Sequence, residues 1–186
     1  MNPYWKFRMK PLLVGLAIAV LRFTGPASDD ATAGALPKDP CALLKPAEIQ
    51  AALAPNASIG SGVSDASGLP LGVGCTYTWG PRTKEWGESA LTITVIDISK
   101  AYAGVSPDLI EQGVFAKAKT SGPNASQIPG VGDAAVFTFE TRVSTATAEA
   151  YFKTKDVDLT VAYHAGDSLP SKDKVIALLK QAGARL

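Results

Sequence analysis

Cys41 and Cys75 are the only two cysteines in a chain of 186 residues. Cys41 lies in Asp-Pro-Cys-Ala-Leu-Leu, just before a helical pattern, and Cys75 lies in Gly-Cys-Thr-Tyr-Thr-Trp, which alternates as a strand does. In an exported chain, two cysteines are typical of one disulfide. Such a bond would join the first helix to the sheet and, by closing a loop of about 34 residues, would stabilise the fold by roughly 3.5–4 kcal/mol. The alternative is two free thiols.

Residues 1–33 have the pattern of a signal peptide. A basic start is followed by an uninterrupted apolar run over 11–21, which is short for a bilayer span and suits the apolar core of an export signal. We therefore expect an exported protein, periplasmic or extracellular, cleaved near Ala33; the alternative is a retained N-terminal anchor. No cysteine follows the apolar run, so the sequence offers no lipid attachment site. Residues 34–38 form a linker, and 39–186 form a single domain.

The charge balance argues against some partners. The whole chain has a net charge of +1, and residues 1–33 carry four basic and two acidic side chains, so the remainder has a net charge of −1. A nearly neutral domain has no electrostatic footprint for nucleic acid, and none for an anionic membrane surface. A membrane contact is expected only if the N-terminal segment is retained.

The pattern of apolar residues predicts an α+β fold. We expect an antiparallel sheet of about five strands with helices packed on one of its faces. Between the first helix and the first strand, residues 56–74 should form a long loop with one short strand around 58–63. The predicted helices cover 46–53, a segment that opens at Pro107, and 171–182, and the predicted strands cover 75–79, 89–98, 134–140, 147–153 and 157–164.

The sequence names no catalytic residue. His164 is the only histidine, no Gly-x-Ser-x-Gly motif is present, and two cysteines with one histidine do not make a zinc site. We expect His164 to be a half-exposed residue at the end of a strand. The predicted site therefore has no catalytic group, no metal and no cofactor.

Aromatic residues near the first hairpin are the best binding candidates. Tyr77, Trp79 and Trp86 are interleaved with polar residues and could form a binding surface together with the loop over 56–74. Alternatively, Tyr77 and Trp79 belong to the core, because they alternate on one strand face. Asp133 follows a glycine in a tight turn, where we expect its carboxylate to accept backbone N–H groups rather than to contact a ligand.

Three motifs together resemble a known family. They are Asp-Pro-Cys-Ala-Leu-Leu-x-Pro-Ala-Glu-Ile from residue 39, Cys-Thr-Tyr-Thr-Trp from residue 75, and Ile-Pro-Gly-Val-Gly-Asp-Ala-Ala from residue 128. Their order and spacing resemble a family of secreted bacterial domains of unknown function, best known as actinobacterial lipoproteins. Similar domains look related to extracellular sensor domains of bacterial kinases and to PsbP-type α+β folds. The resemblance spans about residues 39–184 and implies a paired disulfide and an α+β fold, but no reaction; this chain departs from it in lacking a lipidation cysteine.

The leading functional hypothesis is an exported, non-enzymatic binding or sensory module of the bacterial cell envelope. Its partner would be a small apolar ligand or an envelope protein. One alternative is an envelope enzyme that uses His164 with a carboxylate or a serine. Another is a structural or assembly protein of the envelope.

Overall fold

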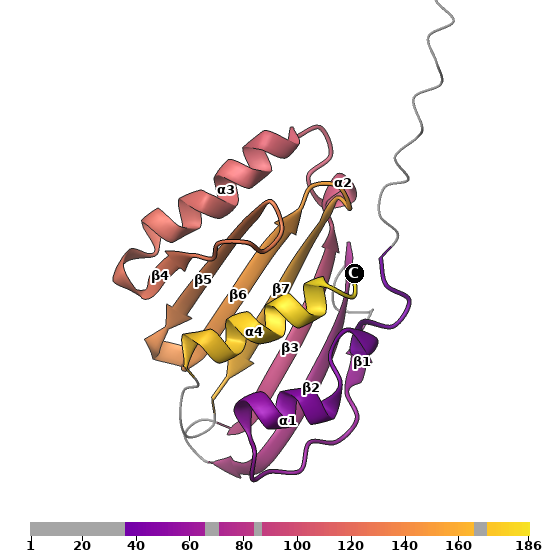
Figure 1. The fold of residues 1–186 in the computed structure, drawn as a ribbon, viewed down its shortest axis with the longest axis vertical. Helices are drawn as coiled ribbons and strands as arrows, with labels where there is room; N and C mark the ends of the chain where they lie inside the picture. The colour runs from indigo at the N-terminus through magenta and orange to yellow at the C-terminus, as the bar shows by residue number, and fades with distance from the viewer. Residues whose placement is uncertain (1–35, 66–70, 84–86, 166–170) are drawn as a thin grey trace, which may run out of the picture. The chain divides into compact units, whose positions relative to one another are not determined.

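The protein is an α+β fold built on one antiparallel sheet (Figure 1). The structure is a computed structural model that describes residues 36–65, 71–83, 87–165 and 171–186. The strands are β1 (Val63–Asp65), β2 (Gly72–Thr83), β3 (Gly87–Asp97), β4 (Ala125–Gln127), β5 (Ala134–Glu140), β6 (Thr145–Phe152) and β7 (Val157–His164). The α-helices are α1 (Pro46–Leu53), α2 (Ile98–Ala101), α3 (Pro107–Thr120) and α4 (Lys172–Gly183), with 3-10 turns η1 (Pro40–Leu43), η2 (Gly122–Asn124) and η3 (Thr141–Val143).

The described part of the chain forms a seven-stranded sheet in the order β1-β2-β3-β7-β6-β5-β4. All neighbouring strands are antiparallel. The strands β4 to β7 follow one another as a meander, and β7 returns to pair with β3 over eight residues, from Ala90 opposite His164 to Asp97 opposite Val157. This pairing joins the two halves of the sheet into one.

The prediction of about five strands was too low. The two additional strands, β1 and β4, have three residues each and lie at the two edges of the sheet. The short strand expected around 58–63 begins only at Val63, and β2 is longer than the predicted 75–79. Strands this short have no readable alternation, because their geometry comes from pairing with a neighbour rather than from their own residues.

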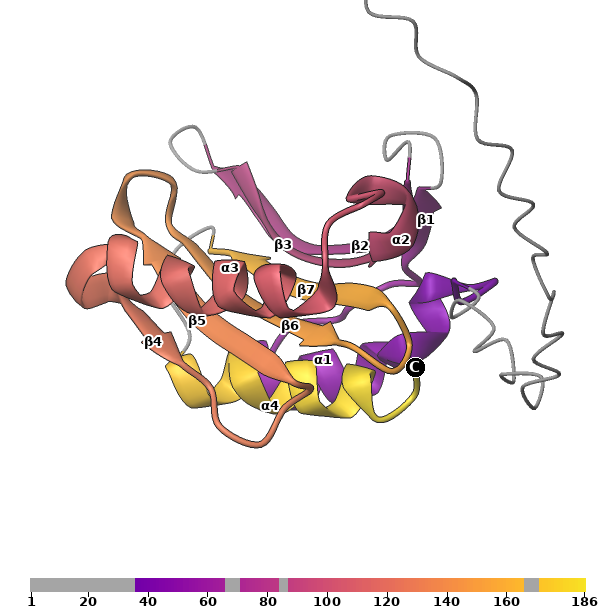
Figure 2. The same cartoon turned by 90° about the horizontal axis from the view of Figure 1, so that it is seen from above.

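One face of the sheet, here called the α4 face, carries the main core. The turn η1 and the helices α1 and α4 pack on it (Figure 2). Strand β6 contributes three alanines to this face, Ala146, Ala148 and Ala150, before Phe152 at its end, and these small side chains let α4 lie close to the sheet. The fully buried strand residues of this face are Cys75, Leu91, Ile93, Val95, Ala148, Ala150, Leu159 and Val161.

The predicted disulfide is present on the α4 face. Cys41 in η1 is bonded to Cys75 in β2, with a Cα–Cα distance of 5.1 Å. The Tyr77 hydroxyl lies 2.6 Å from the Leu44 carbonyl oxygen and 2.8 Å from that of Cys41. The bond and the hydroxyl together join the start of the domain to the second strand, as the cysteine positions predicted.

The opposite face, here called the α3 face, is covered only in part. Helix α3 packs over β4, β5 and β6, where a second, smaller core forms. The prediction that the helices cover one face is therefore wrong, because α3 packs on the face opposite to α1 and α4. The remaining strands present half-buried threonines on this face, namely Thr76, Thr92, Thr94 and Thr160.

Candidate functional site

An open groove lies on the α4 face beside the start of α4, and we call it the β5–α4 groove. It has a volume of about 380 Å³, within the range of small-molecule sites. It is lined by side chains of η2, β4, β5, β6 and the first residue of α4, namely Pro123, Asn124, Ala125, Ser126, Phe137, Phe139, Ala146 and Lys172.

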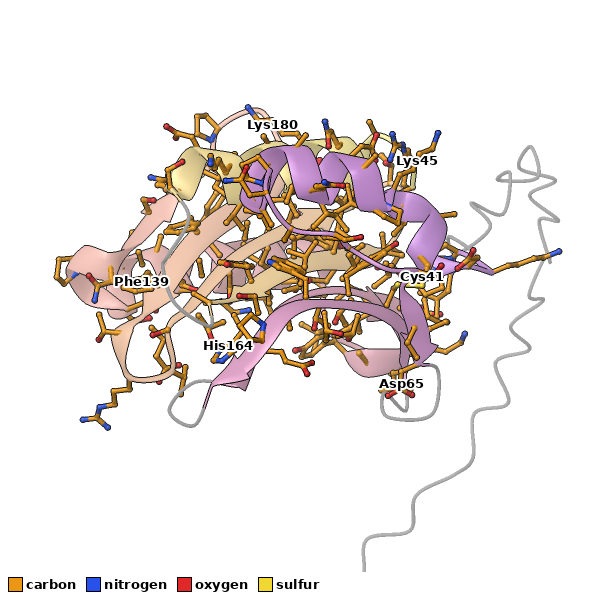
Figure 3. All side chains as sticks on the ribbon, turned by 90° about the horizontal axis from the view of Figure 1, so that it is seen from below. Cys41, Lys45, Asp65, Phe139, His164 and Lys180 are labelled. Carbon is orange, nitrogen blue, oxygen red and sulfur yellow. A yellow bond between two sulfur atoms is a disulfide. The ribbon has the colours of Figure 1, made fainter. Side chains whose placement is uncertain are left out.

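The floor of the groove is apolar because of the strand pattern. Phe137 and Phe139 alternate along β5 and therefore point to the same face, and Ala146 on β6 is the direct partner of Phe139. The alanine is small, so the Phe139 ring has open space beside it instead of a facing side chain. Figure 3 shows Phe139 and Cys41 toward opposite edges of the sheet, so the groove lies far from the disulfide although both are on the α4 face.

Lys172 supplies the positive charge of the groove. Its ammonium nitrogen donates a hydrogen bond of 2.5 Å to the Ser126 hydroxyl on β4 and stands 5.7 Å from the centre of the Phe137 ring. These contacts place the ammonium of the exposed Lys172 at the edge of the groove, beside the Phe137 ring. The groove therefore combines an aromatic floor with a fixed cation at its rim.

The aromatic residues predicted for binding lie elsewhere. Tyr77 is 1% exposed and Trp79 is 7% exposed, so both belong to the core, as the alternative predicted from their alternation. Trp79 stacks on Tyr163 with ring centres 5.7 Å apart. Trp86 lies outside the described residues. In the described chain, Tyr77 and Trp79 are too buried to form an exposed platform.

Asp133 acts as a backbone acceptor in the structure. Its carboxylate accepts a hydrogen bond of 2.7 Å from the backbone N–H of Lys153, at the end of β6, and its own N–H donates to the Tyr151 carbonyl. The predicted structural work is thus present, although the donor is on a neighbouring strand and not in the turn itself. Gly132 has a φ of +55°, and a Cβ there would clash with the Tyr151 carbonyl, so the turn requires glycine.

His164 is half-buried at the end of β7, with Nδ1 3.3 Å from the Thr145 hydroxyl. Asp158, on the same strand face, has a strongly raised pKa. It lies six residues away along β7, a distance of roughly 20 Å in an extended strand. The strand therefore separates His164 from this carboxyl instead of joining them into a catalytic pair.

Asp158 belongs to a polar network at the edge of α3. Burial, and then repulsion from the nearby Glu149 carboxylate, raise its pKa to about 8. Glu149 also forms an ion pair with Lys117 of α3, and the Thr160 hydroxyl lies 3.3 Å from the Asp158 carboxyl. The network satisfies its own members, and we assign it to the fold.

The described residues include neither a candidate metal site nor a membrane-spanning helix. Their histidines, cysteines and carboxylates form no group of three or more that could hold a metal ion. Their helices include none that is long and apolar enough to cross a membrane.

The residues of the β5–α4 groove were not identified from the sequence as a site. The alternation of Phe137 and Phe139 was visible, but it indicates only a buried strand face. Phe139 is half-buried and Phe137 is nearly buried, and the groove beside them exists because of the point at which α4 begins, which depends on packing between distant segments. Comparisons with models of protein families, with curated proteins and with solved structures found no match to this chain.

Proposed function

We propose that this chain is an exported, non-enzymatic binding module of the bacterial cell envelope that holds a small apolar ligand in the β5–α4 groove. The observation that carries the proposal is the groove itself, whose apolar floor is the half-buried Phe139 ring together with the edge of the nearly buried Phe137 ring. Concave sites lined by apolar and aromatic side chains with a few polar groups are typical of ligand sites.

Two further features support an exported role. The Cys41–Cys75 bond is of a kind that persists in oxidising compartments. The basic and apolar pattern of residues 1–33 supports export independently, because it concerns a different part of the chain. The resemblance to secreted bacterial domains of unknown function agrees with both and adds no reaction.

Binding can be tested with N-phenyl-1-naphthylamine, a neutral fluorophore that brightens in apolar surroundings. We expect saturable binding to the protein, and we expect Phe139→Ala to weaken it by about tenfold, because this change removes half of the aromatic floor. Phe152→Ala is the matched control, since Phe152 is also half-buried on this face but does not line the groove. Absence of saturable binding, or equal weakening by both variants, would contradict the proposal.

A further inference from the structure

The β5–α4 groove has a charged rim as well as an apolar floor, and this combination points to a class of ligand. We propose that the ligand is an amphipathic carboxylate, with its apolar chain on Phe137 and Phe139 and its carboxylate at Lys172 and Ser126. This inference rests on the proposed function and names the chemistry of its ligand.

Lys172 has contacts that leave its charge unpaired among the described residues. Within the described residues, no carboxylate lies within ion-pair distance of its ammonium, whose contacts are a hydroxyl and an aromatic ring. An ammonium group has three N–H donors, and Ser126 accepts only one of them. The remaining donors can therefore bind an anion that enters the groove.

Other lysines of the fold differ from Lys172 in having a carboxylate partner. Three of them are neutralised by a carboxylate of the protein, in the pairs Lys100–Asp97, Lys117–Glu149 and Lys153–Asp108. Lys172 instead stands at the mouth of the groove beside the Phe137 ring, and a ligand that fills the groove would displace water near its ammonium, which strengthens an ion pair. A ligand carboxylate would supply the charge that the protein supplies elsewhere.

The polar contact at the rim of the groove, between Lys172 and Ser126, has the size of one ligand headgroup. One ammonium and one hydroxyl can match one carboxylate, with a charge-assisted hydrogen bond from Lys172 and a neutral one from Ser126. Lys172 is also the first residue of α4, a helix of 12 residues whose dipole favours negative charge at this end. The groove volume of about 380 Å³ is near the lower limit of ligand sites, which suits one apolar chain rather than two.

The test compares decanoate with decanol, which have the same chain length and differ in the headgroup. Each compound is added to purified full-length protein that has bound N-phenyl-1-naphthylamine, and the loss of fluorescence measures how tightly the compound binds. We expect decanoate to bind about tenfold more tightly than decanol, as one charge-assisted contact allows. Lys172→Met should abolish this preference while decanol still binds, and Lys172→Arg should keep it.

Lys180→Met is the matched control, because Lys180 is an exposed lysine of the last turn of α4 and does not line the groove. It should leave the preference for decanoate unchanged. The inference is overturned if wild-type protein binds decanoate and decanol equally, or if Lys172→Met keeps the preference; in both cases the proposed function survives. If neither compound nor the fluorophore binds, the proposed function fails first.

Discussion

The two faces of the sheet are built from the same strands but differ in what covers them. Along β3, Ile93 and Val95 are fully buried on the α4 face, while their neighbours Thr92 and Thr94 are half-buried on the α3 face. Valine and threonine have nearly the same shape. At these positions the α4 face therefore presents a methyl group where the α3 face presents a hydroxyl. The α4 face is a core stabilised by burial and a disulfide, whereas much of the α3 face is a polar surface with one small core.

This comparison predicts the largest effect for the disulfide, which crosslinks the α4 face alone. Replacing both cysteines, Cys41→Ala with Cys75→Ala, should lower the free energy of unfolding by about 2–4 kcal/mol, because the unfolded chain gains freedom. Urea denaturation of the variant and of oxidised wild type measures the difference. Reduced wild-type protein is the control and should lose a similar amount. A free energy of unfolding that stays unchanged would show that the bond adds no stability.

Reciprocal substitutions on β3 test the faces directly. Val95→Thr buries a hydroxyl among apolar side chains and should cost about 1–3 kcal/mol. Thr94→Val makes the same exchange in reverse on the α3 face and should change the free energy of unfolding by less than about 0.5 kcal/mol. Thermal or urea denaturation of both variants gives the two values. If both substitutions lowered the free energy of unfolding equally, the two faces would be equally buried in solution, and the proposed difference between them would be wrong.

The sequence predicted the features that depend on neighbouring residues. The alternation in Thr-Ile-Thr-Val from Thr92 identifies β3, and the broad apolar stripe from Val175 identifies α4. The cysteine positions predicted the disulfide correctly. In each case the pattern lies within one element, so local chemistry is enough to read it.

The features that were missed depend on distant contacts. β4 reads as polar loop in Ala-Ser-Gln and becomes a strand only by pairing with β5. The second helix layer forms because α3 packs against Ala134, Val136 and Tyr151, which share one buried face. The sequence does not show that these three residues are buried together. The β5–α4 groove was missed for the same reason, because the position of Lys172 over Phe137 depends on tertiary packing.

The third prediction concerns the carboxyl group buried on the α3 face. Burial raises the pKa of Asp158 to about 8 from an ordinary value of 3.8, so the folded protein holds a proton there that the unfolded chain releases above pH 4. The free energy of unfolding should therefore fall as the pH rises from about 4 to about 8. Asp158→Asn keeps the shape without the charge and should stabilise the protein by about 1–3 kcal/mol at pH 8, with little effect at pH 4.

The control for this prediction is Asp108→Asn. Asp108 is exposed on α3, and its hydrogen bond and ion pair with Lys153 lower its pKa, so any contribution it makes is present at neutral pH and is lost as the pH falls through that lowered pKa. Its variant should be slightly less stable at pH 8, the opposite sign to Asp158→Asn. Denaturation curves from pH 4 to pH 8 measure both. Destabilisation by Asp158→Asn at pH 8 would show that the carboxyl is charged and well paired in the fold.

The smallest effect is expected from the aromatic stack on the α4 face. Trp79 on β2 and Tyr163 on β7 lie across β3 with their ring planes inclined by 16°. A double-mutant cycle with Trp79→Leu and Tyr163→Leu should give a coupling energy of about 0.5–1.5 kcal/mol, because stacked rings attract beyond the area that they bury.

Phe152 supplies the control cycle for the stack. It lies on the same face but far along the sheet. Phe152 is opposite Val157, which is opposite Asp97 of β3, whereas Trp79 is opposite Ser89 of β3, eight residues before Asp97. At roughly 3.3 Å per residue this separation exceeds 20 Å, so Trp79→Leu and Phe152→Leu should be additive within about 0.3–0.5 kcal/mol. If both cycles gave the same coupling, the energy would come from general loosening of the core, and the specific contact between Trp79 and Tyr163 would contribute nothing of its own.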